Sequence, residues 1–200
     1  MPLPEGNWGN QEGNQLINDQ HQYNIQELQQ FVQRGLPTLN SQQIALYDAV
    51  MNSVVNNLGT PFFLHSGGGC GKTYLANLIA ASVCARGEIV LCVASTGLVS
   101  LLLPGGCTAH SCFKIPIPIH EQSTCNIKKD DLTHQLLQHT SLIIWDEAES
   151  QHYYVLEAVD RTLRDLLNRD IPFESITMLL SGDFRQTLPV IETLLKWLAL

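Results

Sequence analysis

A glycine-rich run that ends in lysine and threonine has the residue types needed to hold a phosphate chain. It reads Ser66-Gly67-Gly68-Gly69-Cys70-Gly71-Lys72-Thr73. Glycines allow successive backbone N–H groups to face an anion, and a helix that begins directly after the run adds partial positive charge. The lysine of such a loop reaches the β- and γ-phosphates, and the hydroxyl of Thr73 ligates Mg²⁺. We therefore predict a nucleotide site formed by Gly67, Gly68, Gly69, Cys70, Gly71, Lys72 and Thr73. The alternative is a glycine-rich turn before an ordinary helix.

Two adjacent carboxylates, Asp146 and Glu147, directly follow the apolar run Leu142-Ile143-Ile144-Trp145. A carboxylate at the tip of a strand can hold the Mg²⁺ that Thr73 also contacts. The next carboxylate can orient and deprotonate the water that attacks the γ-phosphate. We predict Thr73 and Asp146 as metal ligands and Glu147 as the catalytic base. The alternative for such a pair is a solvated strand end.

Two glutamines could read the nucleotide. Gln186 ends the polar run Gly182-Asp183-Phe184-Arg185-Gln186, and its amide could sense the γ-phosphate or the attacking water. A simple polar turn explains the same run equally well, and Arg185 could pair either with phosphate or with Asp183. Gln43 precedes the glycine-rich run, and a glutamine amide can bond both the donor and the acceptor of adenine. The chemistry alone favours a solvent-facing side chain in the first turn of a helix for Gln43.

The elements that must position these residues alternate between strands and helices. Apolar runs predict strands at residues 61–65, 89–94, 141–145 and 175–181. A helix is predicted from Asn40 or Ser41 to the terminating run Gly59-Thr60-Pro61, and further helices at about residues 72–86, 98–103, 131–138, 155–167 and 191–200. Residues 107–130 are predicted to be irregular. This alternation predicts an α/β fold with a mostly parallel sheet and helices on both faces, in which ligands bind at the carboxyl ends of the strands. The chain ends soon after the fourth predicted strand.

The composition of the 200 residues limits the possible functions. The net charge is −8 with only 11 Lys and Arg, which argues against a surface that grips nucleic acid over its whole extent. The six cysteines include no Cys-x-x-Cys pair, so they predict reduced thiols rather than a zinc site. We find no secretory signal and no apolar run of membrane-spanning length. Thirteen of the first 34 residues are Asn or Gln, which predicts a poorly ordered leader over residues 1–36, with a short amphipathic helix suggested by Ile25, Leu28, Phe31 and Val32.

In combination, these motifs resemble the Pif-type ATP-dependent 5′-to-3′ DNA helicases of superfamily one, especially the branch carried by Helitron transposons. The matching stretches follow the family's order and are residues 39–43, 67–73, 94–97, 101–106, 108–111, 113–116, 141–148, 160–165 and 182–190. Four positions depart from the family pattern. Ser66 and Ser181 replace glycines, and Glu149-Ser150 replace the usual Pro-Met.

The resemblance implies a P-loop NTPase of the RecA-like fold, with residues 37–200 as the N-terminal ATPase domain of such a helicase. It implies that Lys72, Glu147 and Gln186 act in ATP hydrolysis and that Gln43 contacts adenine. It also implies that a path for single-stranded DNA is lined by Ser95, Thr96, Gly97, Thr108 and His110. A structural hydrogen bond is an equally good explanation of His110. Backbone amides and hydroxyls can hold phosphates without net positive charge, which suits the acidic composition.

The family reaction is ATP hydrolysis coupled to translocation on single-stranded DNA and unwinding of duplex DNA. The resemblance implies a nuclear location, with the mitochondrion as a second compartment, and roles in repair, recombination, telomere maintenance or transposon replication. The family's second RecA-like domain carries the arginine finger, and we expect this chain without it to bind nucleotide better than it hydrolyses it. The alternative function is a non-catalytic, transposon-derived remnant that at most binds nucleotide. A GTPase is disfavoured because no Asn-Lys-x-Asp motif is present, and a small-molecule kinase because a basic lid is lacking.

Overall fold

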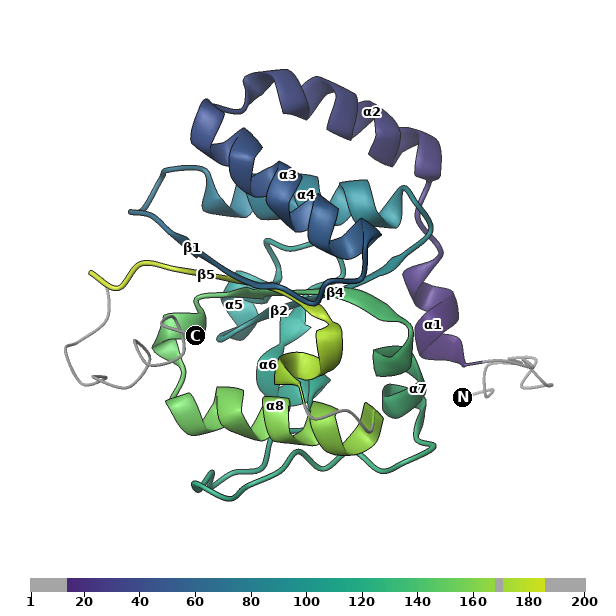
Figure 1. Cartoon of the computed structure of the whole chain (residues 1–200), viewed down its shortest axis with the longest axis vertical. Helices are drawn as coiled ribbons and strands as arrows, with labels where there is room; N and C mark the ends of the chain where they lie inside the picture. The colour runs from purple at the N-terminus through teal and green to yellow at the C-terminus, as the bar shows by residue number, and fades with distance from the viewer. Residues whose placement is uncertain (1–13, 168–170, 186–200) are drawn as a thin grey trace, which may run out of the picture.

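The computed structural model describes residues 14–167 and 171–185, and these form a five-stranded parallel sheet between two layers of helices (Figure 1). The strand order is β1-β5-β4-β2-β3, with the bounds β1 Pro61–His65, β2 Ile89–Ala94, β3 Cys107–Thr108, β4 Thr140–Asp146 and β5 Thr177–Gly182. Every neighbouring pair in this sheet is parallel. The predicted α/β fold is therefore confirmed, and the two-residue strand β3 is added at one edge.

The sheet is buried on both faces because successive side chains of each strand point in opposite directions. In β2, Val90 and Cys92 join the core on one face, while Leu91 and Val93 join the core on the other. All six residues of β2 are buried. A strand covered on both faces has a nearly continuous apolar sequence, and this explains why the run at 89–94 predicted its bounds correctly.

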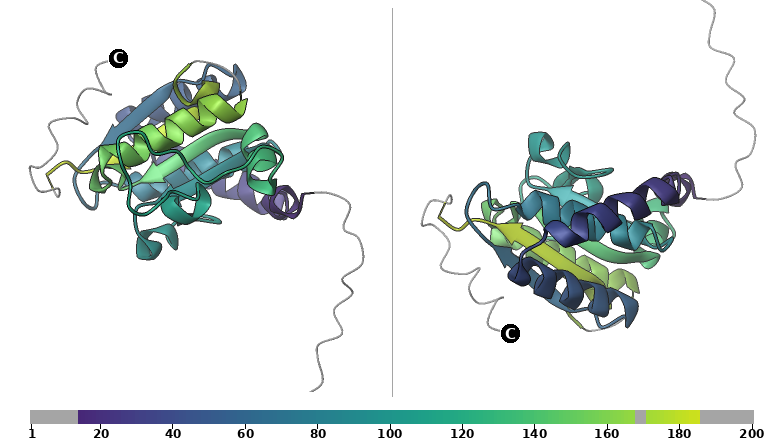
Figure 2. Two further views of the ribbon diagram at one scale, coloured as in Figure 1. Left: turned by 90° about the horizontal axis from the view of Figure 1, so that it is seen from below. Right: turned by 90° about the horizontal axis from the view of Figure 1, so that it is seen from above.

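One face of the sheet is covered by α3 Ser41–Val55 and α4 Lys72–Cys84, with α2 Ile25–Gly35 outside them (Figures 1 and 2). Asn40 and Gln43 begin α3 with a reciprocal capping box, in which each side chain bonds the other residue's backbone N–H. The opposite face is covered mainly by α8 Tyr153–Leu167 and α7 Leu132–Gln138. This places helices on both faces, as predicted.

The leader is better ordered than the sequence suggested. Residues 1–13 lie outside the described residues, but α1 Gln15–Gln20 and α2 are regular helices. Gly35 explains how α2 packs on α4: a Cβ at this position would overlap Leu78 Cδ1, so only glycine permits the close approach. The expectation of poor order is thus corrected for residues 14–35, because α2 packs against α4 with Gly35 buried and Leu28 and Val32 half-buried.

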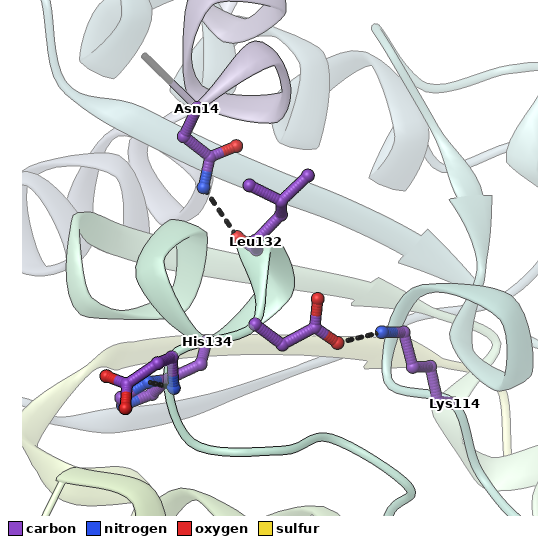
Figure 3. Close-up of polar contacts among 6 residues, drawn as sticks. Asn14, Lys114, Leu132 and His134 are labelled. Carbon is purple, nitrogen blue, oxygen red and sulfur yellow. Dashed lines mark hydrogen bonds and ion pairs between the residues drawn. The ribbon is translucent and has the colours of Figure 1, made fainter. Parts of the chain in front are cut away.

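The segment between β2 and β4 contains more structure than predicted. The helix expected at 98–103 is the shorter α5 Gly97–Ser100, and the part predicted to be irregular contains β3 and α6 Ala109–Cys112. Figure 3 shows polar contacts that hold the remainder of this segment in place around the start of α7. Lys114 forms an ion pair with Asp131, the ring of His134 accepts a hydrogen bond of 2.9 Å from the backbone N–H of Asp130, and Asn14 donates one of 2.7 Å to the carbonyl of Leu132.

Three short 3-10 turns complete the described structure, η1 Leu36–Thr38, η2 Ala148–Ser150 and η3 Pro172–Ser175. The helix predicted at 191–200 lies outside the described residues. Over the described ranges, no helix has the length and apolar character needed to cross a membrane.

Candidate nucleotide site

The glycine-rich loop follows β1 and leads directly into α4, as a phosphate-binding loop must. Gly69 and Gly71 have φ angles of 74° and 81°, in the region where a side chain is strained. Ser66 is not among the residues with positive φ, so a serine fits the first position of the loop without backbone strain. Its hydroxyl is buried without a hydrogen-bond partner, whereas its backbone N–H donates to the carbonyl of Gly182 at 3.4 Å.

The ammonium group of Lys72 lies along the loop itself. Its Nζ donates hydrogen bonds to the carbonyl oxygens of Ser66 at 2.6 Å and Gly67 at 3.1 Å. These bonds hold the positive charge over the loop that begins α4. Lys72, which the sequence predicts to bind phosphate, therefore lies along the glycine-rich loop, at the N-terminus of a 13-residue helix.

Asp146 ends β4 and is buried. Its Oδ1 accepts hydrogen bonds from the Ser181 hydroxyl at 2.6 Å and from the Glu147 backbone N–H at 3.1 Å. Ser181, one of the departures from the family pattern, thus orients this carboxylate from the neighbouring strand β5. A fixed carboxylate and the Thr73 hydroxyl are hard oxygen donors of the kind that Mg²⁺ prefers. Within residues 14–167 and 171–185, His, Cys, Asp and Glu form no group of three that could hold a metal alone. A Mg²⁺ site here would need the hydroxyl and phosphate oxygens as well.

Glu147 has a left-handed backbone, with φ at 54°, which is uncommon for a residue with a side chain. Its carbonyl oxygen accepts three hydrogen bonds, from the Ser95 hydroxyl at 2.5 Å, the Ser150 hydroxyl at 2.8 Å and the Ser150 backbone N–H at 3.0 Å. Partial burial, and then the nearby carboxylates of Asp146 and Glu149, raise the pKa of the Glu147 carboxyl, while Lys72 opposes the rise. A raised pKa suits a group that must accept a proton near neutral pH.

The turn after β5 lies beside the acidic turn. Glu149 is buried, and its Oε1 accepts a hydrogen bond of 2.8 Å from the backbone N–H of Asp183. The backbone N–H of Arg185 donates to Asp183 Oδ1 at 3.1 Å, so this contact between the two residues uses the backbone of Arg185. Gln186, the predicted sensor of the γ-phosphate, lies outside the described residues, and its role stays a prediction.

Gln43 reaches the loop from the start of α3. Its Nε2 donates to the carbonyl of Cys70 at 3.4 Å, while its Oε1 caps the N–H of Asn40 at 3.0 Å. The side chain therefore contacts the nucleotide loop rather than pointing only to solvent. Its contact with adenine stays a prediction.

The five residues predicted to line a DNA path gather at the carboxyl ends of β2 and β3. Ala94 and Thr108 are partners in the parallel pairing, and a Cβ at Gly97 would lie 3.9 Å from Thr108 Cγ2. The hydroxyls of Thr96 and Thr108 accept bonds from backbone N–H groups that begin α5 and α6. The Ser95 hydroxyl points to Glu147. Among the described residues, the ring of His110 has no hydrogen-bond partner. The structure thus brings this set together, and contact with DNA stays a prediction.

The sequence analysis did not assign roles to Ser181, Glu149 and Ser150. Each was noted only as a departure from a family pattern, and each bonds a residue far away in the sequence or a backbone group of the acidic turn. The contact between Ser150 and Glu147 is local, whereas no local signal in the sequence could have predicted the contacts of Ser181 and Glu149, because they depend on how β4 and β5 lie side by side.

The fold and this site define the class of the protein. It is a P-loop NTPase, in which the phosphate-binding loop and the acidic turn lie at the same edge of a parallel sheet. A family model described as PIF1-like helicase matches residues 38–196. The chain belongs to the PIF1-like helicase family.

Relatives and solved structures agree with this membership. The chain is 33% identical over 134 residues to the ATP-dependent DNA helicase Pif1 of Psychrobacter sp. (strain PRwf-1), covering 66% of this chain and 20% of that protein. It is 32% identical over 134 residues to the ATP-dependent DNA helicase PIF4 of Trypanosoma brucei brucei, covering 64% of this chain and 16% of that protein.

Two solved structures have similar folds. A structure of two coordinating Pif1 helicases at forked double-stranded DNA is 25% identical, with a TM-score of 0.64, and the match covers 80% of this chain and 37% of that one. Pif1 from Bacteroides sp in complex with ADP-AlF4 is 27% identical, with a TM-score of 0.59, and the match covers 76% of this chain and 34% of that one. The chain thus spans a fifth or less of these curated relatives and about a third of these solved chains.

Proposed function

We propose that this chain is the nucleotide-binding part of an ATP-dependent DNA helicase that couples ATP hydrolysis to 5′-to-3′ movement on single-stranded DNA and to duplex unwinding. The observation that carries the proposal is that the phosphate-binding loop and the acidic turn lie at the same edge of the sheet. The loop follows β1 and the acidic turn follows β4, and these two strands lie on either side of β5. Lys72 also lies close enough to Glu147 to oppose the rise of its pKa. Such an arrangement is what phosphoryl transfer to water requires.

In this proposal the chain's own residues divide the work. The backbone N–H groups of residues 67–73 surround the β- and γ-phosphates, and Lys72 leaves the loop carbonyls to contact phosphate oxygens. Glu147 orients water and accepts its proton, while Ser95 and Ser150 hold the backbone of Glu147 in place. Thr73 and Asp146 would hold Mg²⁺, which neutralises charge that develops on the phosphate oxygens. Gln43 would contact adenine, and Gln186 would report the state of the γ-phosphate.

The DNA side of the proposal uses the ends of β2 and β3. Backbone amides and hydroxyls there, at Ser95, Thr96, Gly97, Thr108 and His110, would contact the phosphates of a single strand. Solved structures of relatives include Bacteroides Pif1 bound to single-stranded DNA and two Pif1 helicases at forked double-stranded DNA, which supports this class of partner. We extend the proposal to the Helitron-like branch, to a nuclear or mitochondrial location, and to roles in repair, recombination, telomere maintenance or transposon replication.

Hydrolysis in this family is proposed to need a second RecA-like domain that supplies an arginine. An arginine of this kind contributes on the order of 10³–10⁵ to the rate. We therefore expect the 200-residue chain to bind Mg²⁺-ATP and to hydrolyse it slowly. The alternative is a non-catalytic, transposon-derived remnant that at most binds nucleotide.

The test is ATP hydrolysis and binding of a fluorescent ATP analogue by the purified chain with Mg²⁺, with and without single-stranded DNA. Lys72→Ala serves as the matched control, because it removes the ammonium and keeps the loop glycines. Lys72-dependent turnover that rises with DNA supports a helicase motor domain. Lys72-dependent binding without turnover supports a passive binder or a domain that needs its partner domain. The absence of both turnover and binding would overturn the proposed function.

A further inference from the structure

A third carboxylate, Glu149, lies behind the two that the proposed function uses. It belongs to η2, two residues after Glu147, and only 5% of its surface is exposed. Its Oε1 accepts the hydrogen bond from the backbone N–H of Asp183, and its Oε2 is buried without a hydrogen-bond partner. Burial of a carboxylate with one unpartnered oxygen is unfavourable, so a carboxylate in this position needs a role that offsets the cost.

Gly182 provides the space for this carboxylate. A Cβ built on Gly182 would overlap Oε2, Cδ and Oε1 of Glu149, so no other amino acid can occupy position 182 while Glu149 keeps this position. The carboxylate therefore rests directly on the backbone of the last residue of β5. The side chain of Glu149, from the turn after β4, thus fixes the position of the backbone at the end of β5.

The same point of β5 also contacts the phosphate-binding loop. The carbonyl of Gly182 accepts the bond from the Ser66 N–H at 3.4 Å, and Asp183 Oδ2 lies 3.9 Å from the position of a Cβ on Gly67. Glu149 therefore contacts the Gly182–Asp183 backbone on one side, while that backbone contacts the loop on the other. The acidic turn, the turn after β5 and the phosphate-binding loop are joined through one carboxylate.

We propose that Glu149 is a positioning residue that holds Gly182 and Asp183 against the phosphate-binding loop, so that the loop can close on the triphosphate. The inference rests on the proposed function, since it concerns the same nucleotide site. Glu149 is buried, and the two contacts through which we propose it acts are the hydrogen bond from the Asp183 N–H and its packing on Gly182. This positioning effect is separate from the influence of the Glu149 charge on the pKa of Glu147.

Two variants of similar size separate positioning from packing. Glu149→Gln keeps the volume and a carbonyl oxygen for the Asp183 N–H, whereas Glu149→Met keeps the volume but removes both oxygens. Glu121→Gln is the control, because Glu121 is an exposed acid away from this turn. Each purified chain is assayed for thermal unfolding, for the affinity of a fluorescent ATP analogue with Mg²⁺, and for the hydrogen exchange and chemical shift of the Asp183 amide by NMR.

We expect Glu149→Met to lose protection of the Asp183 amide and to bind the analogue at least about tenfold more weakly. Glu149→Gln and Glu121→Gln should stay within about twofold of the wild type. In the wild type, Mg²⁺ and the analogue should shift the Asp183 amide resonance, a readout that does not depend on any variant folding.

Three results separate the possible failures. An unshifted Asp183 amide in a wild-type chain that binds the analogue would overturn the role of Glu149. Folded Glu149→Met that binds as tightly as Glu149→Gln would overturn it as well, because the missing oxygen would then have no effect on the site. A wild-type chain that binds no analogue would instead overturn the proposed function, and the positioning role with it.

Discussion

The hydroxyl of Ser95 donates a hydrogen bond of 2.5 Å to the backbone carbonyl oxygen of Glu147. Ser95 follows β2, at the edge where the sequence predicts a DNA path, and Glu147 follows β4 in the nucleotide site. The backbone N–H of Ser95 also donates to the carbonyl of Asp146 at 3.3 Å. Ser95 therefore connects the predicted DNA path with the predicted catalytic residues. A movement of residues 95–97 would be transmitted directly to the acidic turn.

Ser95→Ala tests this connection. Removing the hydroxyl takes one of three donors from the Glu147 carbonyl, and we expect a loss of roughly 1 kcal/mol in the free energy of unfolding. Urea unfolding measures it, with Ser111→Ala as the control, because Ser111 is exposed. Since Ser150 donates to the same carbonyl, Ser95→Ala with Ser150→Ala should cost more than the sum of the single changes. Additive costs would show that the two hydroxyls do not share a function.

Gly182→Ala tests the close contact between β5 and Glu149. The added Cβ would overlap the Glu149 carboxylate and force this side chain away from the Asp183 N–H, so we expect a loss of about 1–3 kcal/mol in the free energy of unfolding. Gly97→Ala is the matched control, because the nearest atom to its Cβ would be at 3.9 Å. Glu149→Ala in the same chain as Gly182→Ala should recover part of the loss. A Gly182→Ala chain as stable as the wild type would contradict the contact.

The sequence was sufficient to predict the four long strands because each is an apolar run bounded by turn residues. It was not sufficient for β3, since two residues pairing with Val93 and Ala94 leave no pattern of their own. The loop, Lys72 and Asp146 were predicted because their spacing is local. Glu149 was missed as a site residue because its function depends on Gly182, which lies on the neighbouring strand β5 and far along the chain. Tertiary contacts of this kind have no periodic signal.

The leader gives a further prediction, which concerns where the folded domain begins. Val32 and Leu36 pack against the apolar core that includes α4, and Gly35 allows α2 to approach Leu78 of α4 closely. A chain that starts at residue 37 would expose this apolar surface, so we expect it to lose about 3 kcal/mol or more relative to a chain that starts at residue 14. Urea unfolding of the two truncated chains gives the difference directly. Equal stability would place the domain boundary at residue 37, as the sequence analysis proposed.

The buried thiols predict a loss of stability at alkaline pH. Burial raises the pKa of Cys84 and of Cys125 to about 11, from an ordinary value near 9, because a thiolate is poorly solvated in the interior. Since the folded-state pKa is the higher one, the stabilisation is complete below pH 9 and is lost as the pH rises toward 11. The midpoint of urea unfolding should therefore fall between pH 8 and pH 10.5. The chain with both Cys84→Ala and Cys125→Ala isolates the thiols from other titrating groups, because its midpoint should fall less over this interval. An equal fall in both chains would show that the two thiols do not cause the loss.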